Sequence, residues 1–194
     1  MHIFADYHMH SKYSDGRATI REMAEAARKK GLEQIAITDH GPKNIGTGVK
    51  KAETFLAIKE EIEKLNQDLP DLQVLAGAEA NIVDLEGCID VPAKIYKQLD
   101  LLLVGLHPYV LPNDLQTARD YVFINSIHKH VGSAKEKATN TNTKTLVEAL
   151  HRHQVDIVTH PGLGMPLNLE EVAKACVATK TAFEINVGHS YQNV

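Results

Sequence analysis

Two histidines near the start of the chain are the first residues whose types and spacing could do chemistry. His8 and His10 follow a short apolar run, and the pattern predicts a strand within the first ten residues. Side chains two apart in a strand point to the same face, and two imidazoles that converge on one point suit a metal ion. Asp15 adds a carboxylate just past this strand. A His-x-His pair is common by chance, so this interpretation depends on further ligands in matching places.

Such ligands occur at the ends of four later strands. Short apolar runs that alternate with helical patterns predict parallel strands in βαβ units, at 34–38, 72–77, 101–106 and 155–159. The residues at or just past the carboxyl ends of these strands are His40, Glu79, His107 and His160. Because right-handed crossovers place all these ends on one side, we expect the six side chains from five strands to converge there. A core or loop role explains any one histidine, but it explains the set poorly.

The rest of the pattern supplies the elements that must position these residues. Apolar residues at helical spacing predict helices at 19–30, 52–66, 92–98, 113–131, 143–153 and 169–178. Residues 181–186 predict a sixth strand, and the polar stretch 132–142 is interpreted as a loop. The fold class is therefore α/β, with a parallel sheet.

Four other histidines form two more His-x-His pairs, His128 with His130 and His151 with His153. Both pairs fall in predicted helices, where residues two apart lie on roughly opposite sides and do not chelate one ion. We expect solvated or helix-end roles for them. His189 is left unassigned.

Composition limits the class of protein. The 194 residues predict a single domain over 1–194, with 43% hydrophobic and 24% charged residues, and no run is long enough to span a membrane. A net charge of −4 makes nucleic acid a poor default partner. Cys88 and Cys176 are far apart and no signal segment is evident, so we expect a reducing, cytoplasmic setting. Homo-oligomer formation is left open.

As an ordered set, these motifs resemble the polymerase and histidinol phosphatase (PHP) family of metal-dependent phosphoesterases. The likeness spans nearly the whole chain and is closest to the small stand-alone phosphatases, through residues 137–141 and the context of Glu79. The matching segments are 6–10 with 13–16, 38–41, 77–81, 105–107, 159–162 and 184–186.

The resemblance implies a distorted seven-stranded TIM-like (β/α) barrel with up to three divalent ions, namely zinc, manganese or iron. On this basis His8 and His10 hold a first ion, Glu79 bridges it to a second held by His107 and His160, and Asp15 and His40 hold a third. Glu79, His107 and His160 are thus the expected catalytic set. The implied reaction is hydrolysis of a phosphate monoester of a small molecule by a metal-activated hydroxide.

One departure from the family leaves alternatives open. Family members close the barrel with a strand that ends in an Asp-x-His pair, and this chain ends at Val194 before any such pair. We therefore expect the last βα unit to be missing from this chain. A non-catalytic metal-binding regulatory module and an exonuclease-like phosphodiesterase are the rival functions.

Overall fold

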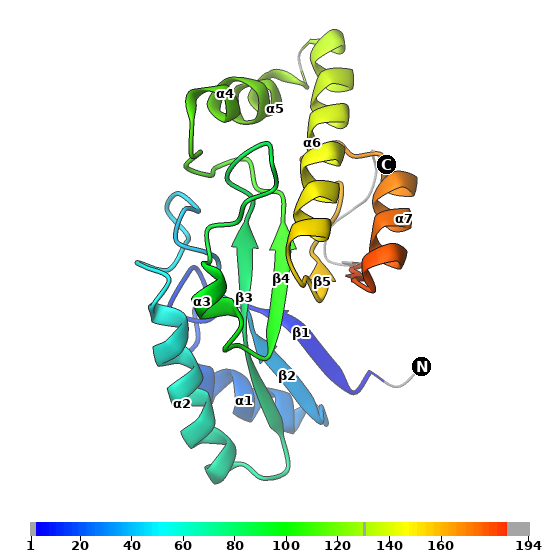
Figure 1. The fold of residues 1–194 in the computed structure, drawn as a ribbon. Coiled ribbons are helices and arrows are strands. Elements are labelled where there is room, and N and C mark those ends of the chain that lie inside the picture. Colours follow the sequence, from blue (N-terminus) through cyan, green and yellow to red (C-terminus); the bar gives the residue numbers. More distant parts are fainter. Residues whose placement is uncertain (1–2, 130, 186–194) are drawn as a thin grey trace. The chain divides into compact units, whose positions relative to one another are not determined.

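The computed structural model describes residues 3–129 and 131–185 (Figure 1). The chain divides into two compact units. Unit 1 comprises Met1–Pro42, Gly46–Glu79 and Val91–Leu102, and unit 2 comprises Lys43–Ile45, Ala80–Asp90 and Leu103–Val194. The strand pairs within each unit are parallel, as expected for βαβ units. The α/β fold class is confirmed, while the single domain, the barrel closure and the missing βα unit stay predictions.

Unit 1 is built on three parallel strands joined by helices. β2 pairs with both β1 and β3, so β2 is the middle strand. The elements are β1 (Ala5–Met9), α1 (Ile20–Lys29), β2 (Gln34–Ile37), α2 (Thr54–Asp68), β3 (Gln73–Asn81) and α3 (Ala93–Tyr96), with the last two residues of β3 belonging to unit 2. Five of these six elements lie where the sequence places them, and β3 extends farther than predicted.

The core of unit 1 forms because each element presents an apolar face. Ile35 and Ile37 of β2 are fully buried, as are Phe55 and Ile58 of α2. Helix α1 begins with a capping box, in which the Thr19 side chain accepts from the Glu22 N–H and the Glu22 carboxylate accepts from the Thr19 N–H. This box satisfies backbone donors that a helix start otherwise leaves open.

The strand register of unit 1 contains one irregularity near the predicted site. Asp6 is paired with Ile35 and Met9 with Ile37, so β1 carries one more residue than β2 over this stretch. A bulge of this kind bends a strand and redirects its side chains, and bulges are frequent beside active sites. His8 lies within the irregular stretch and His10 follows it.

Unit 2 contains the carboxyl-terminal half of the predicted sheet. β5 pairs with both β4 and β6, and helices α6 and α7 pack side by side (Figure 1). The elements are β4 (Leu101–Gly105), α4 (Leu115–Thr117), the π-helical turn η1 (Ala118–Phe123), α5 (Ile124–Ile127), α6 (Gly132–Arg152), β5 (Ile157–Val158), α7 (Leu169–Thr179) and β6 (Ala182–Phe183). The first two residues of β4 belong to unit 1.

The interpretation of residues 132–142 as a loop is wrong, because α6 begins at Gly132. Its polar residues find partners that are compatible with a helix. The Thr139 hydroxyl donates to the Lys135 carbonyl at 2.9 Å, and the side chains of Asn142 and Asn125 hydrogen-bond to each other at 2.7 and 2.8 Å. Threonine and asparagine favour turns when only local sequence is considered, and here tertiary packing outweighs that preference.

The histidines outside the strand ends are only partly helical. His151 lies in α6, but His128 and His153 are the residues that cap the ends of α5 and α6, and His153 has an extended backbone. His130 and His189 fall outside the described residues. Among the helices of the described part of the chain, none is both long and apolar enough to cross a bilayer.

A matched pair of glycine variants tests the packing of α6 against the turn at residue 87. Gly87 and Gly46 both have positive φ, but a Cβ at Gly87 would lie 2.3 Å from the Ala149 backbone nitrogen, whereas a Cβ at Gly46 has open space. We expect Gly46→Ala to cost about 1–2 kcal/mol of unfolding free energy from backbone conformation alone. Gly87→Ala should cost about 1–3 kcal/mol more because of the clash. Urea denaturation measures both, and equal losses would contradict the packing described here.

Candidate metal centre

Five of the seven predicted ligands lie in unit 1, and strand pairing brings four of them together. His40 forms an isolated parallel bridge with Glu79, in which the Glu79 N–H donates to the Asp39 carbonyl at 3.0 Å. The Gly41 N–H donates to the Glu79 carbonyl at 2.9 Å, which extends the pairing beyond β2. The Thr38 N–H donates to the Met9 carbonyl at 2.8 Å, so the chain that carries His8 and His10 is tied to the same edge.

The Glu79 carboxylate is the centre of this group. Its side chain has 0% exposure, and three imidazole nitrogens approach its two oxygens. His8 Nε2 lies 3.4 Å from Oε1, while His10 Nε2 and His40 Nδ1 lie 3.5 and 2.8 Å from Oε2. The prediction that these side chains converge is confirmed for unit 1.

Asp15 completes a ring of four side chains with His10, His40 and Glu79. Its Oδ1 lies 3.5 Å from His10 Nδ1, and its Oδ2 lies 3.9 Å from His40 Nε2. Each of the two imidazoles therefore has one nitrogen toward Glu79 and the other toward Asp15. Asp15 is 42% exposed, whereas the two imidazoles are 20% and 12% exposed, so the ring has one open side.

The pKa values of the two imidazoles, His10 and His40, are shifted in opposite directions. Burial lowers the pKa of His10 below its ordinary value, and the opposing effect of Glu79 is smaller. Burial also acts to lower the pKa of His40, but the hydrogen bond and charge of Glu79 together outweigh it, so this pKa is raised. A positive charge on this side of the buried carboxylate is therefore favoured.

This donor set fits a divalent transition metal. One atom each from His10, His40 and Glu79 lies within 4.8 Å of the other two, which is close enough for one ion to contact all three. Imidazole nitrogens with one or two carboxylates are ligands that zinc, iron and manganese accept.

Asp39, a buried aspartate to which the sequence assigns no role, holds the loop of residues 11–16 beside this site. Asp39 has 0% exposure, and its carboxylate accepts from the Ser11 N–H and the Ser11 hydroxyl, each at 2.7 Å. It also accepts from the Ser14 hydroxyl. The loop is tight, because a Cβ at Gly16 would lie 2.0 Å from the His10 carbonyl oxygen. The Thr-Asp-His-Gly run marked this position, but nothing in the sequence identified its partners.

The other two predicted ligands, His107 and His160, lie together in unit 2. His107 follows β4 and His160 follows β5, and their ring centroids are 5.1 Å apart in an edge-on arrangement. His160 has a φ of +30°, which is rare for a residue with a side chain. Its backbone N–H donates to the Glu184 carboxylate, which follows β6.

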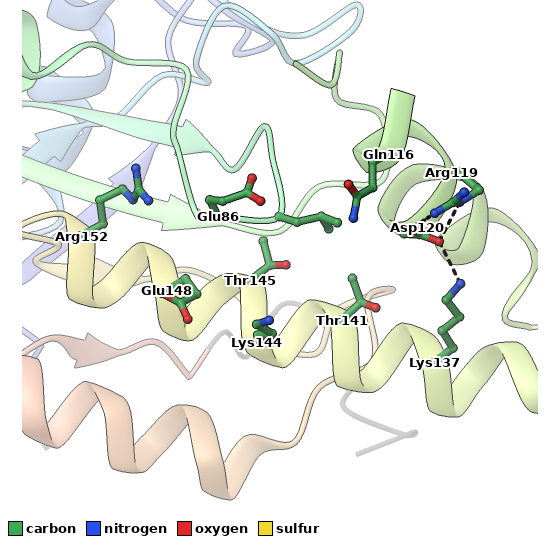
Figure 2. A pocket seen from close by; sticks show the side chains of 11 residues that line it. Glu86, Gln116, Arg119, Asp120, Lys137, Thr141, Lys144, Thr145, Glu148 and Arg152 are labelled. Carbon is green, nitrogen blue, oxygen red and sulfur yellow. Dashed lines mark hydrogen bonds and ion pairs between the residues drawn. The ribbon is translucent and has the colours of Figure 1, made fainter. Parts of the chain in front are cut away.

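A cavity of about 580 Å³ lies elsewhere in unit 2, between α6, the α4–η1 segment and the turn at Leu85 and Glu86 (Figure 2). Asp120 is held there by Arg119 and Lys137, with N···O distances of 2.6 and 2.8 Å. These two cations hold the pKa of Asp120 well below its usual range. None of the eleven residues that line this cavity is a predicted metal ligand.

Comparison with known proteins identifies relatives of this chain. The chain is 32% identical over 190 residues to a probable phosphatase from Thermoanaerobacter sp. (strain X514), covering 96% of this chain and 65% of the relative. It is 29% identical over 192 residues to the DNA polymerase/3'-5' exonuclease PolX of Bacillus subtilis (strain 168), covering 95% of this chain and 29% of the relative. The chain thus spans about two thirds of the length of the probable phosphatase.

A similar solved structure and a family model agree with these relatives. The structure is histidinol phosphate phosphatase from Lactococcus lactis subsp. lactis Il1403, complexed with zinc, L-histidinol and phosphate. The TM-score is 0.59 at 16% identity, with 94% of this chain and 72% of that chain covered, and this likeness shows a shared fold. The PHP domain model matches residues 6–179. The chain therefore belongs to the PHP domain family.

Proposed function

We propose that this chain is a metal-dependent phosphatase that hydrolyses a phosphate monoester of a small molecule. The observation that carries the proposal is the Glu79 carboxylate, which is fully buried and has the nitrogens of His8, His10 and His40 within 3.5 Å. A fully buried carboxylate is costly unless positive charge is close to it. The probable phosphatases among the relatives support the reaction class.

The residues of unit 1 have distinct roles in this proposal. Glu79 and His8 bind a first ion with His10, and Asp15 with His40 binds another, with His10 beside both carboxylates. The partly exposed Asp15 borders the side from which a phosphate could approach. Divalent ions, when bound, supply a nucleophile at neutral pH and neutralise phosphoryl charge.

We assign His107 and His160 to a further ion. Their support is family membership, their places after β4 and β5, and the 5.1 Å separation of their rings. Zinc, manganese and iron are the candidate metals, and the zinc in the similar histidinol phosphate phosphatase favours testing zinc first. The number of ions and the cytoplasmic location stay predictions, and homo-oligomer formation stays open.

The exonuclease-like reaction is the second candidate function, because PolX matches over 95% of this chain. The net charge of −4 argues against it, since nucleic acid binding draws most of its affinity from cationic contacts with phosphates. A metal-binding regulatory module is the third candidate. The three functions differ in what they hydrolyse, so one pair of chromogenic substrates separates them.

We expect metal removal to abolish hydrolysis of p-nitrophenyl phosphate, and added zinc or manganese to restore it. The physical reason is that the protein ligands alone provide no strong nucleophile for a phosphate ester. The measurement is the release of p-nitrophenol before chelation, after chelation and after reconstitution. Faster hydrolysis of bis-p-nitrophenyl phosphate than of the monoester would favour the phosphodiesterase, and no turnover of either would favour the regulatory module.

Glu79→Gln is expected to lower metal content and monoester hydrolysis together. An amide has the shape of the carboxylate but lacks its charge, so it cannot offset the charge of bound cations. Even partners outside the ligand set affect metal affinity by about 10–100-fold, and we expect at least this loss here. Glu63→Gln, an exposed position on α2, is the matched control. Retention of normal metal content by the Glu79 variant would refute its central role.

His151→Ala and His153→Ala are expected to leave metal content unchanged. His151 lies in α6, and His153 Nε2 is 3.2 Å from the Gly87 carbonyl oxygen, so local contacts account for it. His10→Ala provides the contrast and should lose metal. The measurement is elemental analysis of dialysed protein, with circular dichroism as the test of folding. Metal loss in the His151 or the His153 variant with an intact fold would show that the strand-end assignment is incomplete.

A further inference from the structure

We propose that Asp39 is a positioning residue that sets the ring formed by His10, Asp15, His40 and Glu79. This inference rests on the proposed metal centre and goes beyond it, because Asp39 is absent from the predicted ligand set. Asp39 precedes His40 in the chain, and its carbonyl oxygen accepts from the Glu79 N–H at 3.0 Å. Its backbone thus fixes the positions of two ring members, His40 and Glu79.

The Asp39 side chain fixes the positions of the other two ring members, His10 and Asp15. Ser11 follows His10 and donates to the carboxylate through both its N–H and its hydroxyl at 2.7 Å. Ser14 precedes Asp15, and its hydroxyl donates to Asp39 Oδ1 and lies 3.4 Å from Asp15 Oδ1. One buried carboxylate therefore holds both the residue next to His10 and the residue next to Asp15.

Backbone hydrogen bonds within the loop couple the position of Ser11 to that of Asp15. The Ser14 and Gly16 N–H groups both donate to the Ser11 carbonyl, at 3.1 and 3.0 Å. A shift of Ser11 therefore moves the whole turn that carries Asp15, while His40 stays on the sheet. Hydrogen-bonded partners that orient metal ligands typically contribute about 10–100-fold to metal affinity. We expect this range for Asp39.

The test compares the wild-type chain with Asp39→Ala, Asp39→Asn and Ser14→Ala. The probes are Zn²⁺, Mn²⁺ and Co²⁺ alone, followed by calorimetric titration, elemental analysis and the visible spectrum of the Co²⁺-saturated protein. Asp39→Ala should bind one class of ion about 10–100-fold more weakly. Asp39→Asn should be intermediate, because its one oxygen still accepts from the Ser11 N–H, and Ser14→Ala should show the smallest loss.

Asp100→Asn is the matched control, because Asp100 also accepts from a backbone N–H, that of Ala76 at 2.8 Å, and its other carboxylate oxygen lies 3.5 Å from Lys59 Nζ. It should keep the wild-type affinity and Co²⁺ spectrum. A purely structural role for Asp39 would lower the melting temperature of the metal-free protein without altering that spectrum. A Co²⁺ spectrum of the Asp39 variants that differs from the wild-type spectrum would therefore support the positioning role.

The outcomes separate this inference from the proposed function. If the wild type binds metal while Asp39→Asn and Ser14→Ala match its affinity and spectrum, the positioning role is overturned and the metal centre stands. If the wild type binds none of the three metals, both are overturned. Should Asp39→Ala fail to fold, the two milder variants still decide, because Ser14 is only partly buried and lies on a loop.

Discussion

The burial of the Glu79 carboxylate among imidazoles is the constraint on which the centre in unit 1 depends. An ionised carboxylate with no exposure loses its hydration, and this loss is costly unless positive charge replaces it. The hydrogen bond and charge of Glu79 raise the pKa of His40, so a protonated imidazole is one source of that charge. A divalent cation supplies it better, because it contacts several donors at once. The same interaction therefore explains both the proton preference of His40 and the affinity for metal that we propose.

The backbone makes this burial possible by simple strand pairing. The bridge between His40 and Glu79 sets two neighbouring side chains at one edge, and the bulge in β1 alters the direction of the chain that carries His8 and His10. Because the ligands come from three strands, the centre requires the sheet of unit 1 to be formed. Metal binding and folding of this unit should consequently be coupled.

The sequence predicted the positions of the ligands better than the contacts between them. Alternation in the first strand placed His8 and His10 on one face, and the buried runs before His40 and Glu79 located the same edge, because both patterns follow directly from strand geometry. Residues 132–142 were misinterpreted because the partners of Asn142, such as Asn125, lie 17 residues away and are invisible to local propensity. Asp39 was given no role for the same reason, since Ser11 lies 28 residues away.

Unit 2 maintains a backbone conformation at His160 that is unfavourable for a residue with a side chain. A non-glycine residue at φ +30° costs about 1–3 kcal/mol, and such a residue persists only where its surroundings hold it. Here the Glu184 carboxylate accepts from its N–H, and the Thr159 N–H before it donates to the Val104 carbonyl at 3.1 Å. Two anchors from neighbouring strands thus maintain an unfavourable backbone that keeps the His160 ring beside that of His107. Strain maintained in this way is typical of residues selected for where they place a side chain, and it favours a ligand role for His160 over a packing role.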